Sequence, residues 1–156
     1  MRLLNSVCDL LAKKYPGTPV YIEGVPEGFQ RPSFLVSLVT DSSNLQNINV
    51  YQDNPTFQIV YFNQRNEVLQ VRTEGLYQKK EELKALFLLS GVIPVIAKPG
   101  VTEKKRYAHV SNFQADVRLL ENSLSCRLVL TFTDDARVEE VYDLIEDVEL
   151  SVKNEI

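Results

Sequence analysis

Apolar and polar residues alternate over two long runs in the second half of this chain. Residues 107–120 and 124–133 each alternate with a period of two, and Glu121-Asn122-Ser123 forms a turn between them. This period is typical of strands that have one buried and one wet face. The pattern therefore predicts a long hairpin. Its buried face is expected to hold Tyr107, His109, Ser111, Phe113, Ala115, Val117 and Leu119 from the first strand, and Leu124, Cys126, Leu128, Leu130 and Phe132 from the second.

Shorter runs predict further extended segments at residues 20–22, 33–41, 56–62 and 92–96. A break is expected at Asp53-Asn54-Pro55, because proline cannot donate a backbone hydrogen bond to a neighbouring strand. Asp41-Ser42-Ser43-Asn44 is either a turn or the frayed end of a long strand.

Helical periodicity appears in two segments. Residues 2–15 form an amphipathic pattern that ends at Pro16-Gly17, and residues 66–89 form a second one with Asn66 as its N-cap. An alternative for the second segment is a short strand at Val68–Val71 and a helix that starts near Leu76. The C-terminal residues fit a helix around Val138–Ile145 and a strand around 148–152.

These elements predict one α+β domain over residues 1–156. We expect an antiparallel or mixed sheet of about four to six strands, with two or three helices packed mainly on one face. The length of 156 residues suits a single domain, and no repeat or linker divides it.

Candidate chemistry is sparse in this chain. It has one histidine, His109, inside a predicted strand, and no phosphate-binding glycine motif, nucleophile motif or zinc spacing. We therefore expect no enzyme activity, no cofactor and no metal. Cys8 and Cys126 fall on apolar faces and are expected to be free thiols. No apolar run approaches the roughly 20 residues of a membrane span, so no membrane association is expected.

Charge is distributed unevenly along the sequence. The net charge is −4, which disfavours a protein that grips nucleic acid. A basic stretch contains Lys98, Lys104, Lys105 and Arg106, whereas Asp134 and Asp135 open an acidic C-terminal segment. The two patches are either independent solvated surfaces or the two sides of a head-to-tail contact between subunits.

The segment Tyr21–Val36 combines two glycines and two prolines between apolar runs. This composition indicates connection between strands, and Val25-Pro26-Glu27-Gly28 fits a type I turn. The order of elements around it resembles the tail terminator family of tailed bacteriophages and prophage tail elements. The resemblance rests on an N-terminal helix ending in Tyr15-Pro16, on Glu23–Phe34, on the strand ending in Ile59-Val60-Tyr61-Phe62, and on the long hairpin.

The resemblance implies a structural protein of the virion tail, assembled in the host cytoplasm. It implies a hexameric ring on the last ring of the tail tube, which stops tube polymerisation and presents a surface to the neck or head. The implied partners are other copies of the chain, the tail tube protein and a neck or head-completion protein, and DNA passes through the ring without sequence-specific binding.

Several residues are candidates for these contacts. Arg31 and Glu27 lie near the turn, and either is a candidate for contact with a neighbouring subunit or the tube. The alternative for Arg31 is that it only packs on the sheet edge. Phe29, which lies between them in sequence, is a further interface candidate. The charged patches add Lys104, Lys105, Arg106, Asp134 and Asp135 as interface candidates. Asp116, Glu121 and the C-terminal carboxylates are candidates for the lumen. The alternatives are a head–tail connector subunit and a small ligand-binding module, which would need a deep apolar pocket.

Overall fold

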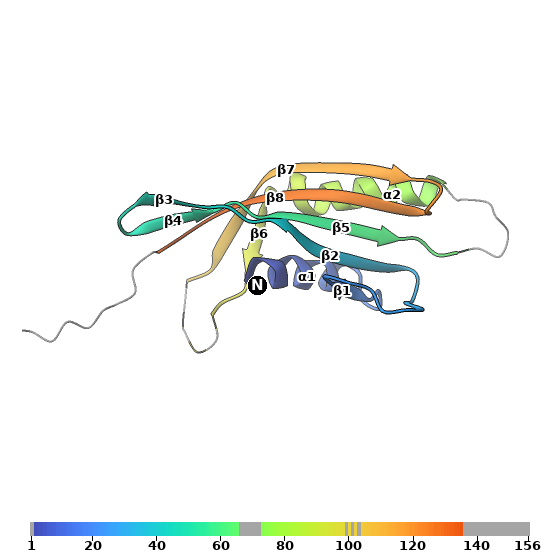
Figure 1. Ribbon diagram of the computed structural model, residues 1–156, viewed down its shortest axis with the longest axis horizontal. Coiled ribbons are helices and arrows are strands. Elements are labelled where there is room, and N and C mark those ends of the chain that lie inside the picture. The colour runs from blue at the N-terminus through green and yellow to red at the C-terminus, as the bar shows by residue number, and fades with distance from the viewer. Residues whose placement is uncertain (1, 66–72, 99, 101, 103, 136–156) are drawn as a thin grey trace, which may run out of the picture.

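A curled mixed sheet of eight strands dominates the computed structural model (Figure 1). The structure describes residues 2–65, 73–98, 100, 102 and 104–135. Its helices are α1 (Arg2–Lys14) and α2 (Thr73–Lys84), and α2 continues into a π-helical turn, η1 (Ala85–Leu89). The strands are β1 (Val20–Ile22), β2 (Ser33–Thr40), β3 (Ser43–Asn47), β4 (Val50–Asp53), β5 (Thr56–Phe62), β6 (Val92–Val95), β7 (Arg106–Arg118) and β8 (Ser123–Asp135).

Strand β8 is the centre of the sheet and has three neighbours. It pairs with β7 along one edge, and with β5 and then β4 along the other. The change of partner falls at Asn54-Pro55, the predicted break, where Pro55 O still accepts a hydrogen bond of 3.0 Å from Leu130 N. Strands β2 and β6 extend the sheet on its two sides, and β1 joins β2 in parallel. The β3–β4 hairpin continues the sheet beyond β5.

Both helices contribute to one hydrophobic core. The inward side chains of β2, β5 and β8 meet the apolar stripes of the helices, and burying each large apolar side chain stabilises the fold by about 1.5–3 kcal/mol. The helical part of this core consists of Leu4, Val7 and Leu11 from α1, and Leu76, Leu83 and Phe87 from α2 and η1.

The predicted sheet of four to six strands under two or three helices is wrong. The protein is mostly β, with eight strands and only two short α-helices in the described part. The prediction missed β3 and β4 because neither strand alternates in burial: all of β3 is exposed and all of β4 is half-buried. An alternating pattern can reveal only strands that have one buried face.

The long hairpin is confirmed, but one part of its predicted face is wrong. All five predicted core residues of β8 are buried, and Phe113, Ala115 and Val117 of β7 face them. Between Val110 and Asn112 the register shifts, and this β-bulge reverses the alternation. Ala108 is therefore the buried residue, whereas Tyr107, His109 and Ser111 are exposed. Leu119, also predicted to face inward, lies in the turn beyond β7 and is exposed.

Other boundaries agree with the sequence. Strands β1 and β5 coincide with their predicted ranges, and α1 ends one residue before its predicted end. Helix α2 begins at Thr73; the proposed start at Asn66 and the alternative strand at Val68–Val71 lie outside the described residues, as do both readings of the C-terminal segment. Cys8 and Cys126 are free thiols, as predicted.

Candidate interface sites

The turn-rich segment between β1 and β2 makes its tight turn one residue later than predicted. Phe29 N donates to Pro26 O at 3.2 Å, so the turn runs from Pro26 to Phe29. Gly28 occupies its third position with φ of 69°, as a type II turn requires, and a type I turn at Val25–Gly28 is therefore wrong. Glu27 is exposed at the second position.

An aromatic cluster lies on the face of the sheet that is turned away from the core. Phe29 stacks on Phe62 of β5 with ring centres 4.7 Å apart, and its ring lies edge-to-face to Tyr21 of β1 at 6.3 Å. The Arg31 guanidinium lies 5.3 Å and 5.2 Å from the centres of the Phe29 and Phe62 rings, a cation–π arrangement. These contacts fix Arg31 against the sheet.

Arg31 also borders an open hollow of about 500 Å³, lined by Gly28, Phe29, Arg31, Gln64 and Arg65. Arg31 donates to Asn63 O at 3.3 Å, and no carboxylate among the described residues forms an ion pair with Arg31 or Arg65. Burial lowers the pKa of Arg31 below its ordinary value, and the neighbouring charge of Arg65 adds to this effect. The hollow therefore presents positive charge that the described chain leaves uncompensated.

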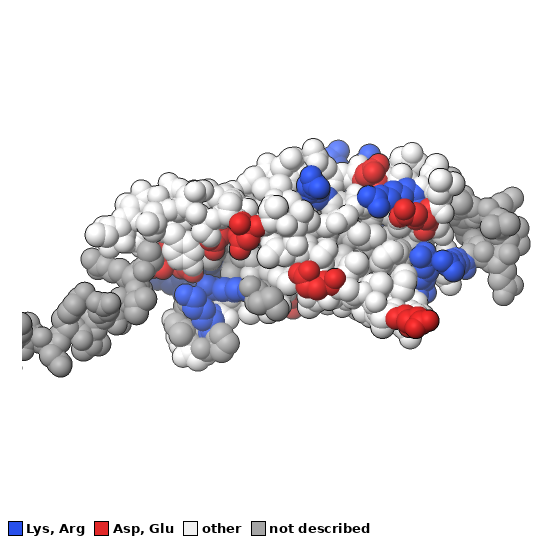
Figure 2. Space-filling view, viewed as in Figure 1, with Lys and Arg blue, Asp and Glu red and all other residues white. Residues whose placement is uncertain are grey.

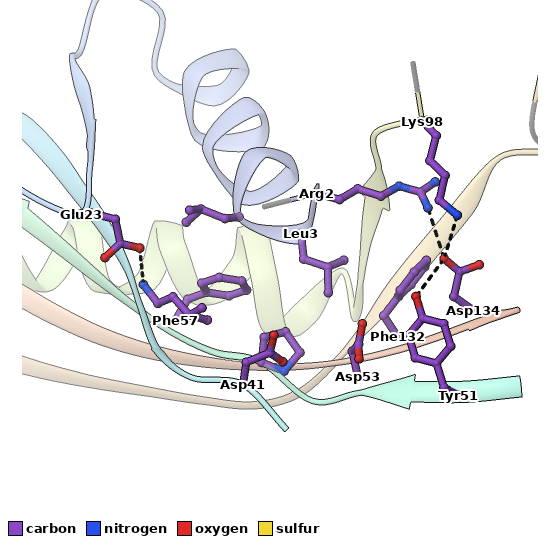
Figure 3. Close-up of a pocket in the computed structure, with 13 residues that line it drawn as sticks. Arg2, Leu3, Glu23, Asp41, Tyr51, Asp53, Phe57, Lys98, Phe132 and Asp134 are labelled. Atoms are coloured by element: carbon purple, nitrogen blue, oxygen red, sulfur yellow. Dashed lines mark hydrogen bonds and ion pairs between the residues drawn. The ribbon is translucent and has the colours of Figure 1, made fainter. Parts of the chain in front are cut away.

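A second charged cluster surrounds Asp134 near the end of β8. This carboxylate forms ion pairs with Arg106 of β7, with Arg2 of α1 at 3.5 Å and with Lys98 at 3.6 Å, and it accepts a hydrogen bond from the Tyr51 hydroxyl at 3.5 Å (Figure 3). Four segments that are distant in sequence thus converge on one buried side chain. We call these five residues the Asp134 cluster.

Burial of Asp134 by itself raises its pKa. The hydrogen bond from Asp135 N at 2.9 Å and the charges of Arg106 and Lys98 outweigh burial, so the pKa of Asp134 is below its ordinary value. The aromatic ring of Phe132 supports the cluster, because the guanidinium of Arg106 lies 5.0 Å and that of Arg2 5.7 Å from its centre.

A hollow of about 280 Å³ adjoins the Asp134 cluster between α1 and strands β2, β4 and β8 (Figure 3). Its wall combines apolar side chains such as Leu3, Phe57 and Phe132 with carboxylates. Glu23 accepts a hydrogen bond from Leu38 N at 3.0 Å. The volume of this hollow lies just below the range of ligand pockets, which is typically about 300–1,000 Å³.

Comparison with known proteins adds a family. A family model described as "Phage tail terminator protein" matches residues 2–141. The chain belongs to this family. No curated protein matches it. The protein is therefore a structural component of a phage tail, and the family suggested by the sequence is confirmed.

In this tail terminator, two charged residues proposed as interface candidates contact each other inside the subunit. Arg106 and Asp134 form an ion pair within one subunit. The sequence had left them either in independent solvated patches or on the two sides of a contact between subunits. Arg106 also donates to Thr133 O, which ties β7 to β8. Lys104, Lys105 and Asp135 are exposed nearby. The other acidic candidates of the C-terminal segment lie outside the described residues.

The proposed lumen residues of the tail terminator lie at the tip of the β7–β8 hairpin. Asp116 and Glu121 are exposed and flank Arg118, at 4.0 Å and 3.6 Å. Figure 2 shows that charges of both signs gather around this tip, while the middle of the visible face carries few charges. Arg127 lines the same shallow hollow as Asp116, so the surface is mixed in charge.

Four residues of these sites were not predicted from the sequence: Arg2, Tyr51, Arg65 and Phe62. The alternation along β8 could have indicated the Asp134 cluster. Asp134 continues the series of inward residues from Leu124 to Phe132, and this pattern predicts a buried side chain. A buried carboxylate requires cationic or hydrogen-bonding partners.

Among the described residues, no group of histidine, cysteine, aspartate and glutamate side chains could hold a metal ion, and no helix has the length and apolar character to cross a membrane.

Proposed function

We propose that this tail terminator closes into a ring on the last ring of the tail tube, with six subunits as the sequence resemblance implies. The ring ends tube polymerisation and offers the surface to which the neck or head attaches. The observation that carries the proposal is the family match over residues 2–141, which spans every described element.

A ring requires two different surfaces on each subunit that complement one another. The Arg31 hollow is one candidate, because a partly buried cation without a carboxylate partner favours a neighbour that brings negative charge. Phe29 lines the same hollow, and Glu27 is exposed in the adjoining turn. Lys104, Lys105 and Asp135 remain candidates for a second contact, whereas Arg106 and Asp134 act as an internal brace beneath it.

The ring also has to let DNA pass. A subunit with a net charge of −4 repels phosphate and so disfavours trapping of the duplex. Asp116 and Glu121 are our candidates for the lumen, with Arg118 reducing the local negative charge. On this proposal the protein has a structural role without catalysis, needs no cofactor and assembles in the host cytoplasm before it becomes part of the virion.

Deletion of the gene from its phage tests this function directly. We expect overlong tails that fail to join heads in electron micrographs, and normal tails when the wild-type gene is supplied in trans. Tails of normal length that still fail to join heads would instead indicate a neck or connector subunit. Binding of the purified protein to purified tail tube protein separates the same two functions, because a connector would bind the portal side first.

A further inference from the structure

Four strands of the sheet have a backbone edge without a neighbouring strand in the described part of the chain: β1, β3, β6 and the distal part of β7. Strand β1 has only three residues and β6 contains Pro94, so β3 and β7 are the edges better suited to pairing with another strand. Strand β3 pairs only with β4. Strand β7 pairs with β6 from Arg106 to His109, and Val110 N then donates to Gly91 O. From Ser111 to Arg118, no described strand pairs with this side of β7. Figure 1 shows β3 in the hairpin that extends at one end of the molecule, and β7 along the upper edge of the sheet.

The hydrogen bond beside β3 shows which of its backbone groups point outward. Asn54 N donates to Ser42 O at 2.7 Å, so Ser42 and Asn54 are a hydrogen-bonded pair. Such pairs alternate along an antiparallel ladder, which makes Asn44–Gln52 the next one. Ser43 and Leu45 therefore direct their N–H and C=O groups away from β4.

The alternation of hydrogen-bonded pairs also shows which backbone groups of β7 point outward. Asn63 N donates to Asn122 O at 3.0 Å on the β5 side of β8, so Ser123 and every second residue after it face β7. Arg118, Asp116 and Gln114 are thus the hydrogen-bonded partners of β8. The outward N–H and C=O groups belong to Phe113, Ala115 and Val117, and the packing of these side chains against the core holds that edge in place.

Each strand contains a β-bulge, and β7 also carries Asp116 and Arg118, but neither free edge, β3 or residues 111–118 of β7, contains lysine or proline, which commonly protect exposed strands. The hairpin also exposes large apolar side chains, with Leu45 at 74% and Ile48 at 88% of full exposure. Unpaired backbone groups beside exposed apolar side chains are typical of an edge that another strand covers.

We propose that β3 of one copy pairs with the free edge of β7 in the next copy, which joins neighbouring sheets around the ring. The two edges are different and belong to different ends of the subunit, so their pairing is head-to-tail and can close a ring, whereas pairing of β3 with β3 would stop at a dimer. This inference rests on the proposed ring and names its contact surface.

A proline substitution tests the pairing. Leu45→Pro removes the outward N–H and leaves the β3–β4 ladder intact, because an edge strand tolerates proline where its N–H faces solvent. Leu45→Val is the matched control, since it keeps both the N–H and an apolar side chain. Purified variants are added to uncapped tubes from a lysate of the deletion strain, and capped tubes are counted by electron microscopy.

We expect Leu45→Val to cap tubes like wild type and Leu45→Pro to need about tenfold more protein, with an unchanged circular dichroism spectrum. Equal capping by Leu45→Pro and wild type would overturn the pairing but leave the ring standing. Failure of wild type itself to cap would overturn the ring, and the pairing with it.

Disulfide trapping gives a second readout that does not depend on the proline variant folding. Asn44 lies on the same outer face as Asn112, Gln114 and Asp116, because its ladder partner Gln52 pairs with Thr133. Asn44→Cys is combined with a cysteine at each of the three β7 positions in turn. The native thiols compete poorly, because burial raises the pKa of Cys8 to about 11 and that of Cys126 to about 12.

Capped tubes should give a disulfide-linked ladder of subunits at one of the three positions and little at the others, because a disulfide needs Cα atoms about 4.4–6.8 Å apart. Asn44→Cys alone should give none. Capped tubes without linkage at any of the three positions would overturn the proposal, and a dimer from Asn44→Cys alone would show β3–β3 pairing in its place.

Discussion

Arg106 and Arg31 occupy similar aromatic settings and differ in their ionic partners. Arg106 lies over Phe132 and forms an ion pair with the buried Asp134. Arg31 lies against Phe29 and Phe62 and, within the described part of the chain, donates a hydrogen bond only to the backbone carbonyl of Asn63. Both were candidates for contacts between subunits, but only Arg31 keeps its charge available.

The difference separates a residue that holds the subunit together from one that can join it to a neighbour. Removing one partner of a buried ion pair leaves the other charge without compensation, and this weakens folding. Removing a cation that has no ionic partner within the fold has little effect on folding and instead weakens any contact that uses it. Stability and assembly should therefore respond to different substitutions.

Asp134→Ala should have the largest effect on stability. The side chain is buried and pairs with Arg106, Arg2 and Lys98, and these cations would lose their common partner. Because the cations are partly exposed, we expect a loss of about 2 kcal/mol, below the range for fully buried pairs. Urea unfolding followed by circular dichroism measures it. Asp135→Ala, which removes an exposed carboxylate next in sequence, should change stability by less than about 0.5 kcal/mol. Equal effects of the two would contradict the brace.

Arg31→Glu should give the opposite profile. We expect about tenfold weaker capping of tail tubes, with a loss of stability below about 1 kcal/mol. Lys14→Glu makes the same change of charge on exposed α1 surface and should leave capping unchanged. If Arg31→Glu supports tails of normal length and number, the role of Arg31 is confined to packing on the sheet edge.

Prolines at strand boundaries and the alternation of apolar and polar residues made much of this fold predictable. Strand β5 is bounded by Pro55 and has strict alternation, so its limits could be read from the sequence. Strand β3 could not, because exposure of all its residues removes the pattern. The bulge at Val110–Asn112 has no distinctive residue, yet it reverses which side of β7 is buried.

The charged sites were predictable only in part, because their partners come from distant segments. Arg2 and Asp134 are 132 positions apart, and only the order of strands brings them together. Sequence alone therefore placed Arg106 and Asp134 in two patches of opposite charge without showing that the patches meet inside one subunit. The Tyr21–Val36 segment could be recognised as a connection between strands because its glycine and proline content is a local signal.

Gly28→Ala tests whether the conformation of the turn before Arg31 matters for assembly. A Cβ at this position meets no atom within 4 Å, but the residue has φ of 69°, where an L-amino acid is strained. We expect a loss of about 1 kcal/mol in the free energy of unfolding. Gly24→Ala is the matched control, because its φ is not positive and a Cβ there also meets nothing. If the turn positions Phe29 and Arg31 for assembly, capping should fall in Gly28→Ala and not in Gly24→Ala.

The pH dependence of stability should show the smallest effect and, of the Arg31 site and the Asp134 cluster, should belong to the Asp134 cluster. The pKa of Asp134 is lower in the folded state than its ordinary value of about 3.9. Its contribution is therefore fully present above that value and is lost as the pH falls through the folded pKa. Wild type and Asp134→Asn should differ in free energy of unfolding by a constant amount from pH 7 to about 5, and the difference should shrink below about pH 4. Arg31→Gln should show no such convergence with wild type, because arginine stays protonated throughout this range. A difference between wild type and Asp134→Asn that stays constant down to about pH 3 would mean that the carboxylate charge does not stabilise the cluster.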